Sequence, residues 1–259
     1  MALQTHSRFY LGLDITIDNS SLDFSEGGGE LQATLSVGNY TFEELAIELK
    51  TQLDNAGALT YTVTTNRQTR SFTVSATGTF ELLITTGTRI GTSAYSLIGF
   101  TGADLTGASS YKSNTSIGTE YVTQYRLQSY VPSSNFKSAS DASVNKTASG
   151  RVEVFSFGQE KFLEMRFNYL TDIAQDPENQ LIRNRPTGVQ DFRDFMDYAI
   201  TKGKIQFMPD ENDFNTYEKI ILESSAGNRD GTGFKMKELF DRGLFDYFDS
   251  GLLTFRVVV

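Results

Sequence analysis

Apolar and polar residues alternate with a period of two along much of this chain, which is the pattern of strands with one buried and one exposed face. The alternation is clear from Leu31 to Leu35 and again from Leu163 to Tyr169. Only two long segments have the spacing of an amphipathic helix instead. The sequence therefore predicts a β-rich α+β protein with antiparallel sheets, because sheets with one polar face are usually antiparallel.

The first helical segment predicts a sheet-plus-helix unit in the N-terminal half. Thr41 and Glu44 have the spacing of a capping box, apolar residues recur on one face after them, and Gly57 follows as a stop. Strand patterns surround this helix, with turns predicted at 66–69 and 76–79 and a helical turn at 93–98. The strand patterns are YTVTT, SFTVSA and FELLITT.

The second helical segment belongs to a C-terminal unit. Apolar residues from Val189 to Ala199 recur on one face, acids occupy the other, and Gly203 follows as a stop. Before it, the segment after residue 151 predicts a hairpin that turns near Gly158. After it, KIQFM, YEKIILES and LLTFRVVV read as strands, with a short helix from Met236 to Arg242. We expect an antiparallel β-sandwich or barrel with one flanking helix.

A polar segment separates the two halves. Residues 132–150 are rich in Ser, Ala and Asn and hold few large apolar residues. This composition predicts a linker, or an extended arm that lies on a neighbouring subunit. The predicted domains are therefore 1–131 and 151–259, joined by 132–150. The alternative is a single interlocked domain in which the N-terminal strands join the C-terminal sheet.

Composition excludes several classes of chemistry. Cysteine is absent and histidine occurs once among 259 residues, so thiol, zinc-thiolate, disulfide and His-rich metal sites are excluded. The net charge of −9, with no positive surplus in either half, predicts no nucleic-acid partner. No stretch approaches the ~20 apolar residues of a membrane span, and the N-terminus does not resemble a signal peptide, so no membrane insertion is expected.

Two glycine-rich segments predict surface loops rather than phosphate sites. The stretch from Thr101 to Ala108 lacks the Lys-Ser/Thr pair of a P-loop. In EGGGE, which begins at Glu26, two carboxylates flank the glycines and would repel phosphate.

The most suggestive chemical motif is MPDENDFNTYEK. A Pro-Asp pair ending at Asp210 and a later acid and lysine are found in metal-dependent nucleases, but Glu218 and Lys219 are adjacent and would point to opposite faces of a strand. Asp210, Asn212 and Asp213 offer oxygen ligands for a weak calcium site, without the spacing of an EF-hand. We interpret this segment as a solvated turn. The sequence therefore assigns no catalytic, cofactor-binding or metal-binding residue.

The order of elements in the C-terminal half resembles that of known structural proteins. The helix GVQDFRDFMDYAITKGK runs directly into IQFMPDENDFNTYEKIILES, and a terminal strand contains FRVVV. This order resembles the ring-forming proteins of tailed-bacteriophage tails, especially distal tail, minor tail and tail-tube-like proteins, over residues 151–259. The segments GNYTFEELAIELKTQLDNAGALTYTVTT and SLIGFTGADLTGASSY are similar to phage virion and tail-fibre proteins.

The resemblance implies a tail-tube-like C-terminal fold and a non-enzymatic role in the virion. The protein would be made in the host cytoplasm and assemble with itself, as a ring such as a hexamer or trimer, and with other proteins of the tail or baseplate. The family carries no catalytic residues or cofactor. Aromatic residues spaced among small polar ones predict the inter-subunit contact. These residues are Tyr111, Tyr121, Tyr125, Tyr130 and Phe136.

Two other functions fit the same sequence. A receptor-binding or glycan-binding tail appendage would use exposed tyrosines, although tryptophan, the most effective sugar-stacking residue, is absent. A polysaccharide hydrolase would need two carboxylates, and no local motif selects a pair among the 32 acids.

Overall fold

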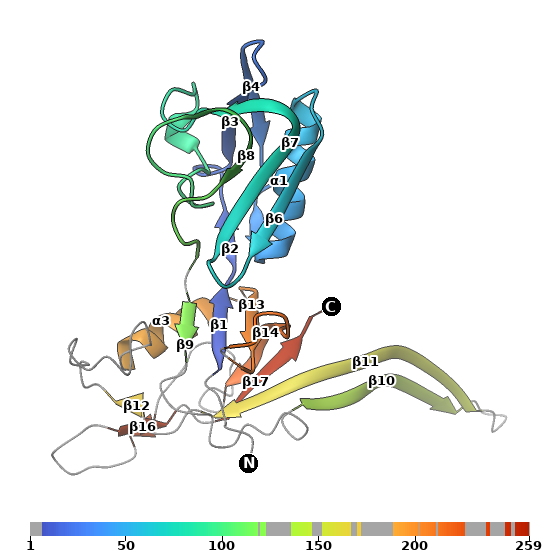
Figure 1. Ribbon diagram of the computed structural model, residues 1–259. Helices are drawn as coiled ribbons and strands as arrows, with labels where there is room; N and C mark the ends of the chain where they lie inside the picture. Colours follow the sequence, from blue (N-terminus) through green and yellow to red (C-terminus); the bar gives the residue numbers. More distant parts are fainter. Residues whose placement is uncertain are drawn as a thin grey trace. The chain divides into compact units, whose positions relative to one another are not determined.

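The computed structural model shows a strand-rich chain that divides into two compact units (Figure 1). Unit 1 comprises Met1–Phe9 and Glu120–Val259, and unit 2 comprises Tyr10–Thr119. The structure describes residues 7–118, 120–122, 136–146, 152–166, 170–171, 189–201, 203–210, 212–225, 237–238, 247–249 and 252–258.

Unit 2 contains the predicted N-terminal helix, α1 (Phe42–Ala56). The Thr41 hydroxyl accepts a hydrogen bond from the Glu44 N–H at 3.4 Å, and the Glu44 carboxylate accepts one from the Thr41 N–H at 3.0 Å. At the other end, the N–H of Gly57 donates to the Leu53 carbonyl at 2.9 Å. The predicted capping box and stop are therefore confirmed.

The strands of unit 2 form one five-stranded sheet and one separate pair. The larger sheet has the order β4-β3-β7-β6, with β8 also paired to β7, and β2 pairs with β5. Helix α1 packs against β4, β5 and β6 (Figure 1). The strand bounds are β2 (Leu13–Ile15), β3 (Ser21–Ser25), β4 (Glu30–Thr34), β5 (Gly38–Tyr40), β6 (Tyr61–Asn66), β7 (Ser71–Leu82) and β8 (Leu105–Lys112).

Two predictions of loops in unit 2 are wrong. The turn predicted at 76–79 lies inside β7, which runs unbroken while its register with β8 shifts between Ser75 and Phe80. The loop predicted from Thr101 to Ala108 contains the start of β8. Both errors arise because glycine and threonine clusters resemble turns, whereas an irregular strand pair accommodates them without ending the strand.

Other turns of unit 2 are confirmed. The turn between β6 and β7 is closed by the Thr69 N–H, which donates to the Asn66 side chain at 2.9 Å. A 3₁₀ helix, η1 (Ile90–Thr92), precedes the predicted helical turn, in which the Ile98 N–H donates to the Ala94 carbonyl at 3.1 Å.

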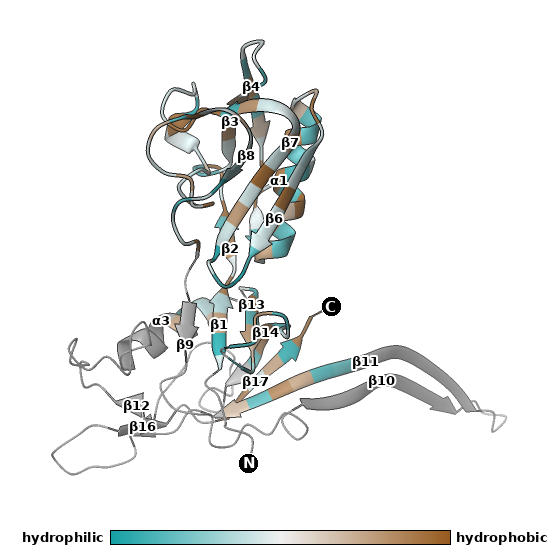
Figure 2. Cartoon of the chain, viewed as in Figure 1, coloured by the Kyte–Doolittle hydropathy of each residue, from teal (hydrophilic) through white to brown (hydrophobic). Residues whose placement is uncertain are grey.

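Unit 2 has its own hydrophobic core between α1 and the sheet. Leu45 and Leu49 of the helix and Phe24, Tyr61 and Phe72 of the strands are fully buried. Figure 2 shows apolar and polar residues alternating along the helix and the central strands. This is the expected result of packing one face of each element.

Unit 1 is built on a seven-stranded sheet with the order β10-β11-β17-β14-β13-β1-β9. The pairs β10–β11, β11–β17, β17–β14 and β14–β13 are antiparallel. The strand bounds are β1 (Arg8–Leu11), β9 (Glu120–Val122), β10 (Phe136–Lys146), β11 (Val152–Arg166), β13 (Ile205–Met208), β14 (Glu218–Ser225) and β17 (Leu252–Val257). A smaller sheet contains β12 (Leu170–Thr171), β16 (Tyr247–Asp249) and β15 (Lys237–Glu238).

One helix, α3 (Val189–Ile200), packs on the sheet of unit 1. The ring of Phe9 lies 5.3 Å from that of Phe195 on α3 and 5.0 Å from that of Phe207 on β13, measured between centroids. Leu253 and Phe255 of β17 are fully buried in the same unit. The predicted helix and the strands β13, β14 and β17 are therefore confirmed, as is the β-rich antiparallel fold class.

Two local predictions in unit 1 are wrong. The predicted hairpin turn near Gly158 does not exist, because β11 continues through this residue and pairs with β10. The helix predicted from Met236 to Arg242 is contradicted at Lys237–Glu238, which form β15. Sequence spacing alone could not show that these segments pair with neighbouring strands, β11 with β10 and β15 with β16.

The two compact units divide the chain differently from the predicted domains. The change lies at Thr119/Glu120 rather than within 132–150, and the chain before Tyr10 belongs with the C-terminal part. Residues 136–146 of the predicted linker form β10. No helix in the described part of the chain has the length and apolar content needed to cross a lipid bilayer.

Candidate assembly interface

Strand β10 forms one end of the seven-stranded sheet and pairs with β11 along its whole length. The register runs from Phe136 opposite Leu163 to Lys146 opposite Val152. Within the described residues no strand pairs with the other side of β10. An edge strand of this length presents a row of backbone N–H and C=O groups to any chain that can pair with it.

The outer part of this strand pair extends beyond the rest of the sheet. Strand β17 pairs with β11 only between Phe162 and Arg166. The remaining pairs join Ser138–Lys146 to Val152–Lys161, and we name these two segments the arm. A ribbon of only two strands is marginally stable in water, so the arm is suited to packing against another surface.

An irregularity in the register bends the arm. Asp141 lies opposite Gly158, whereas the next residue, Ala142, lies opposite Ser156. Phe157 is therefore an extra residue on β11, which is a β-bulge. Bulges increase the local twist and bend a strand, and Figure 1 shows the ribbon curving along its length. Glycine beside a bulge is common because it accepts backbone angles that other residues resist.

Charged side chains join the base of the arm to the neighbouring strands. Arg256 of β17 contacts Glu160 of β11 at 2.6 Å and binds both carboxylate oxygens of Glu223 on β14 at 3.1 Å. Its guanidinium lies 5.5 Å from the centre of the Phe162 ring. Lys161 forms an ion pair with Glu218. These groups are partly exposed, so each pair adds little stability, but together they fix the direction in which β11 leaves the sheet.

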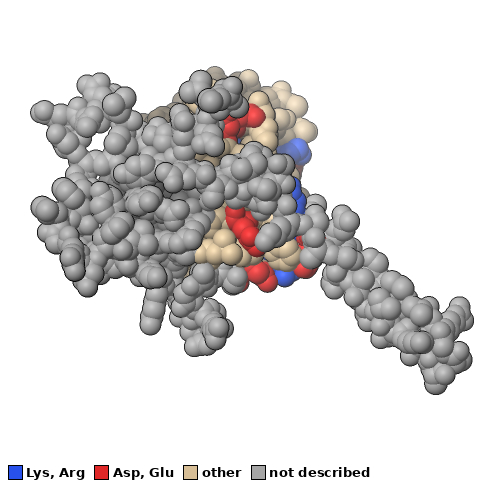
Figure 3. Space-filling model, turned by 90° about the horizontal axis from the view of Figure 1, so that it is seen from below, with Lys and Arg blue, Asp and Glu red and all other residues tan. Residues whose placement is uncertain are grey.

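The charges on this part of unit 1 are mixed. Figure 3 shows acidic side chains at separate places on the described surface, with basic side chains beside some of them. No continuous basic area is visible on the described part of that face. Mixed charges of this kind favour specific contacts over general attraction to a polyanion.

The structure places three of the five predicted contact residues. Tyr121 lies on β9 and Phe136 on β10, at opposite ends of the seven-stranded sheet. Tyr111 belongs to unit 2, where its hydroxyl donates to the Phe80 carbonyl and accepts from the Ala108 N–H, each at 2.8 Å. Tyr125 and Tyr130 lie outside the described residues. Contact of these five aromatic residues with another subunit stays a prediction.

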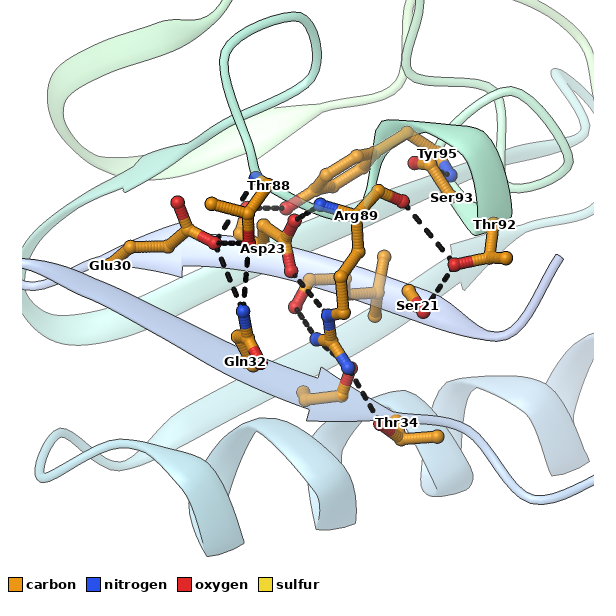
Figure 4. Close-up of polar contacts among 12 residues, drawn as sticks. Ser21, Asp23, Glu30, Gln32, Thr34, Thr88, Arg89, Thr92, Ser93 and Tyr95 are labelled. Carbon is orange, nitrogen blue, oxygen red and sulfur yellow. Dashed lines mark hydrogen bonds and ion pairs between the residues drawn. The ribbon is translucent and has the colours of Figure 1, made fainter.

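Unit 2 contains a buried polar cluster, which we considered as a possible catalytic site (Figure 4). Asp23 of β3 is 3 % exposed, and its two carboxylate oxygens accept the side-chain Nε–H of Arg89 at 2.8 Å and the backbone N–H of Arg89 at 2.6 Å. The guanidinium also donates to the Thr34 hydroxyl and to the Ala33 carbonyl, each at 2.9 Å. The ion pair thus fastens the segment before η1 to β3 and β4.

Neighbouring groups extend this cluster without leaving a reactive group. Glu30 accepts the Thr88 N–H at 3.1 Å and the Gln32 amide at 3.2 Å. The Tyr95 hydroxyl donates to the Asp23 carbonyl at 2.6 Å. Burial, reinforced by the charges of Asp23 and Asp104, raises the pKa of Tyr95 above its usual value. A neutral, bonded phenol beside a paired carboxylate holds the loop and does not serve as a base at neutral pH.

Other acids in unit 2 also bind their own backbone. The glycine-rich EGGGE segment is the turn between β3 and β4, and its first carboxylate, Glu26, accepts the N–H groups of Ala58 and Leu59 at 2.8 and 3.1 Å and the Tyr61 hydroxyl at 2.9 Å. Asp104 accepts the N–H of Thr85 at 2.6 Å. Acids that satisfy loop donors have a structural role that their number in the sequence does not reveal.

The nuclease-like segment has the predicted turn geometry. Asp210 and Asp213 accept hydrogen bonds from the backbone N–H groups of Asn212 and Asn215, each at 2.9 Å. In β14, Glu218 lies opposite Phe207 and Lys219 opposite Gln206, so the two side chains occupy opposite faces of the sheet. Within the described residues no group of three acids or histidines is placed to hold a metal ion.

Sequence reasoning missed Asp23, Arg89 and Arg256. A local signal existed for one of them, because Arg89 is the only arginine between Arg70 and Arg126 and lies in a loop of small residues. Its partner, Asp23, is distant in sequence and could not be identified. No known family model matches the chain, and no curated protein matches it.

Proposed function

We propose that the protein is a non-enzymatic structural component of a phage virion, which assembles through the open edge of the unit 1 sheet into a symmetric ring or another multi-subunit part of the tail or baseplate. The observation that carries the proposal is β10, a long edge strand whose outer side pairs with nothing in the described part of the chain. Unpaired edges are a hazard in a monomer and are useful where a neighbour completes the sheet. The resemblance of residues 151–259 to tail proteins is the reason for proposing that this assembly belongs to a phage tail.

The two ends of the sheet suggest how copies would join. One end is β10 and the other is β9. Contact between different edges of successive copies is heterologous, and such contacts form a ring when the rotation between copies closes. Backbone hydrogen bonds would give the affinity, and the direction of the arm would set the angle.

The arrangement of polar groups supports a structural role over a catalytic one. The buried or half-buried acids discussed above satisfy backbone donors or pair with arginine, and they hold loops in place. A hydrolase would need two carboxylates facing a common space. The acids of unit 2 discussed above face their own loops, and Glu160 and Glu223 of unit 1 are both paired with Arg256.

The tyrosines make the glycan-binding alternative weaker. Tyr10, Tyr61 and Tyr95 are buried, and none of the tyrosines whose side chains are described is fully exposed. Sugar stacking needs an accessible aromatic face. The other tyrosines with described side chains are half-buried, which leaves only part of each ring accessible.

The test is the mass of the full-length protein by light scattering, followed by particle averaging in the electron microscope. We expect a closed oligomer. A matched variant replaces Asp141–Gly158 with Asn-Gly, which closes a two-residue turn at the Ser140–Gln159 pair and keeps Glu160 and Lys161 at the base. This trimmed protein should keep its circular dichroism spectrum and lose the oligomer.

Two results would contradict the proposal. A wild-type protein that stays monomeric at high concentration, alone and with other tail proteins, would remove assembly as its function. An oligomer that survives trimming of the arm would show that the outer part of the open edge, from Asp141 to Lys146, is not the contact.

A further inference from the structure

We propose that unit 2 is an independently folding insert carried by unit 1, and that self-association belongs to unit 1 alone. The assembly half of this inference rests on the proposed function, whereas the folding half does not.

Unit 1 is formed by chain segments on both sides of unit 2. The chain leaves unit 1 through β1 and returns through β9, and these strands are neighbours in the seven-stranded sheet. Figure 1 shows their arrows pointing in opposite directions, so the end of β1 and the start of β9 lie at the same end of the sheet. Insertions are tolerated at such points because the two chain ends that they join are already close.

Each unit also has a core of its own. Among the described residues, the hydrophobic cluster between α1 and its sheet is made of residues between Leu13 and Ile117. The change of unit occurs within β1, where Phe9 packs on Phe195 and Phe207, and the next residue, Tyr10, packs on Phe42 with ring centres 6.0 Å apart. Separate cores are the physical basis of separate unfolding transitions.

The loops of unit 2 are fastened from within. Arg89 joins its segment to β3 and β4, and Glu26 joins the turn before β4 to the start of β6. The Tyr10 hydroxyl donates to the Arg67 carbonyl at 2.9 Å, which holds the entering chain to the β6–β7 turn. All these bonds form between residues of unit 2, so these loop contacts can form within the unit itself.

The edge strands of the two sheets also differ, and the difference favours assembly through unit 1. In unit 2 the edge strands β4, β6 and β8 are all shorter than β10, the pairing of β8 with β7 shifts register twice, and the Ala33 carbonyl of β4 is already bound by Arg89. Short or occupied edges are the usual protection against pairing with another chain. In unit 1 the end strand β10 spans Phe136–Lys146. Pairing between copies is therefore expected at unit 1.

The experiment uses the full-length chain with one matched substitution in each core. Leu49 on α1 and Leu253 on β17 are both fully buried. Leu49→Ala and Leu253→Ala therefore remove the same side-chain atoms from a fully buried position, one in each unit. Scanning calorimetry of the wild type should show two transitions. Each variant should lower one of them by roughly 10 °C and leave the other in place.

Light scattering then separates the two halves of the inference. At a temperature at which only the Leu49→Ala unit is unfolded, the oligomer should keep the mass of the wild type, whereas unfolding of the Leu253→Ala unit should dissociate it. A single transition moved by both variants would overturn independent folding. Dissociation caused by Leu49→Ala would overturn the assignment of assembly to unit 1. A monomeric wild type would defeat the proposed function and the assembly half, while the two transitions would still decide the folding half.

Discussion

At the scale of single residues, unit 2 depends on a few acids that bind backbone N–H groups far along the chain. Asp23 is the most buried of them and has a cation as its partner. Gly87 lies against it, because a Cβ at this position would be 2.6 Å from the Cβ of Asp23. A buried charge that loses its partner costs far more than an exposed one, so these residues should be sensitive to substitution.

Arg89→Met should destabilise unit 2 by about 3 kcal/mol, because it keeps the aliphatic stem and leaves the Asp23 carboxylate without its cation. The control is Lys50→Met, which breaks the exposed pair between Lys50 and Asp54 on α1 and should cost less than about 0.5 kcal/mol. Urea unfolding followed by circular dichroism gives both values. Equal losses in the two variants would mean that the buried pair adds nothing beyond a surface pair.

Unit 2 should lose stability in acid. Burial acts to raise the pKa of Asp104, but hydrogen bonds from Thr86 and Thr85 outweigh it and leave the pKa below its usual value. Hydrogen bonds from Thr88 and Gln32 likewise lower the pKa of Glu30. A carboxyl with a lowered pKa in the folded state adds stability above its unfolded pKa of about 4, and this stability is lost as the pH falls through the folded value.

The measurement is the free energy of unfolding at pH 7 and at lower pH values. Asp104→Asn should reduce the stability at pH 7 and flatten its fall below about pH 4, because the amide does not titrate there. Thr86→Val should act in the same direction by removing a hydroxyl donor. An unchanged acid profile in both variants would show that Asp104 does not contribute to the loss.

At the scale of elements, the helix α1 is specified locally. Thr41→Ala should cost about 1 kcal/mol, because it removes the side chain that accepts the Glu44 N–H. Thr51→Ala is the control within the same helix, where the exposed hydroxyl bonds back to the Ile47 carbonyl and its loss should change stability by less than about 0.5 kcal/mol. The unfolding midpoint of unit 2 reports both, and a silent Thr41→Ala would exclude the cap as a source of stability.

The long strands behave differently from the helix, because distant partners decide where they end. Glycines within β7 and β11 are turn residues by local preference, yet both strands pass through them. In β11 the irregularity becomes a bulge opposite Asp141. A glycine in a strand therefore marks either a turn or a bulge, and the pairing of the residues before and after it with a partner strand decides between them.

At the scale of the whole molecule, unit 2 is inserted in the sequence of unit 1. A fragment of residues 10–118 should fold alone, with the circular dichroism of a mixed α and β protein and the unfolding midpoint of one of the two transitions of the full chain. The physical reason is that, among the described residues, its hydrophobic cluster and the loop hydrogen bonds of Arg89, Glu26 and Tyr10 lie within the unit. A fragment without a cooperative transition would show that unit 1 is needed to complete it.

The features that depend on residues close together in the chain could be predicted from the sequence alone. The capping box at Thr41, the stop at Gly57, the helix before Gly203 and most strands follow from periodicity and local hydrogen bonding, and so does the β-rich class. The opposite directions of Glu218 and Lys219 also follow from strand alternation.

The features that join residues distant in sequence could be identified only in the folded structure. The Asp23–Arg89 pair, the strand β10 within a linker-like segment and the return of the chain through β9 beside β1 each join parts of the chain that no local pattern connects. Their stability comes from burial and from pairing that is available only once the other segment is in place. For this reason the sequence predicted the elements of the protein well and its unit boundaries poorly.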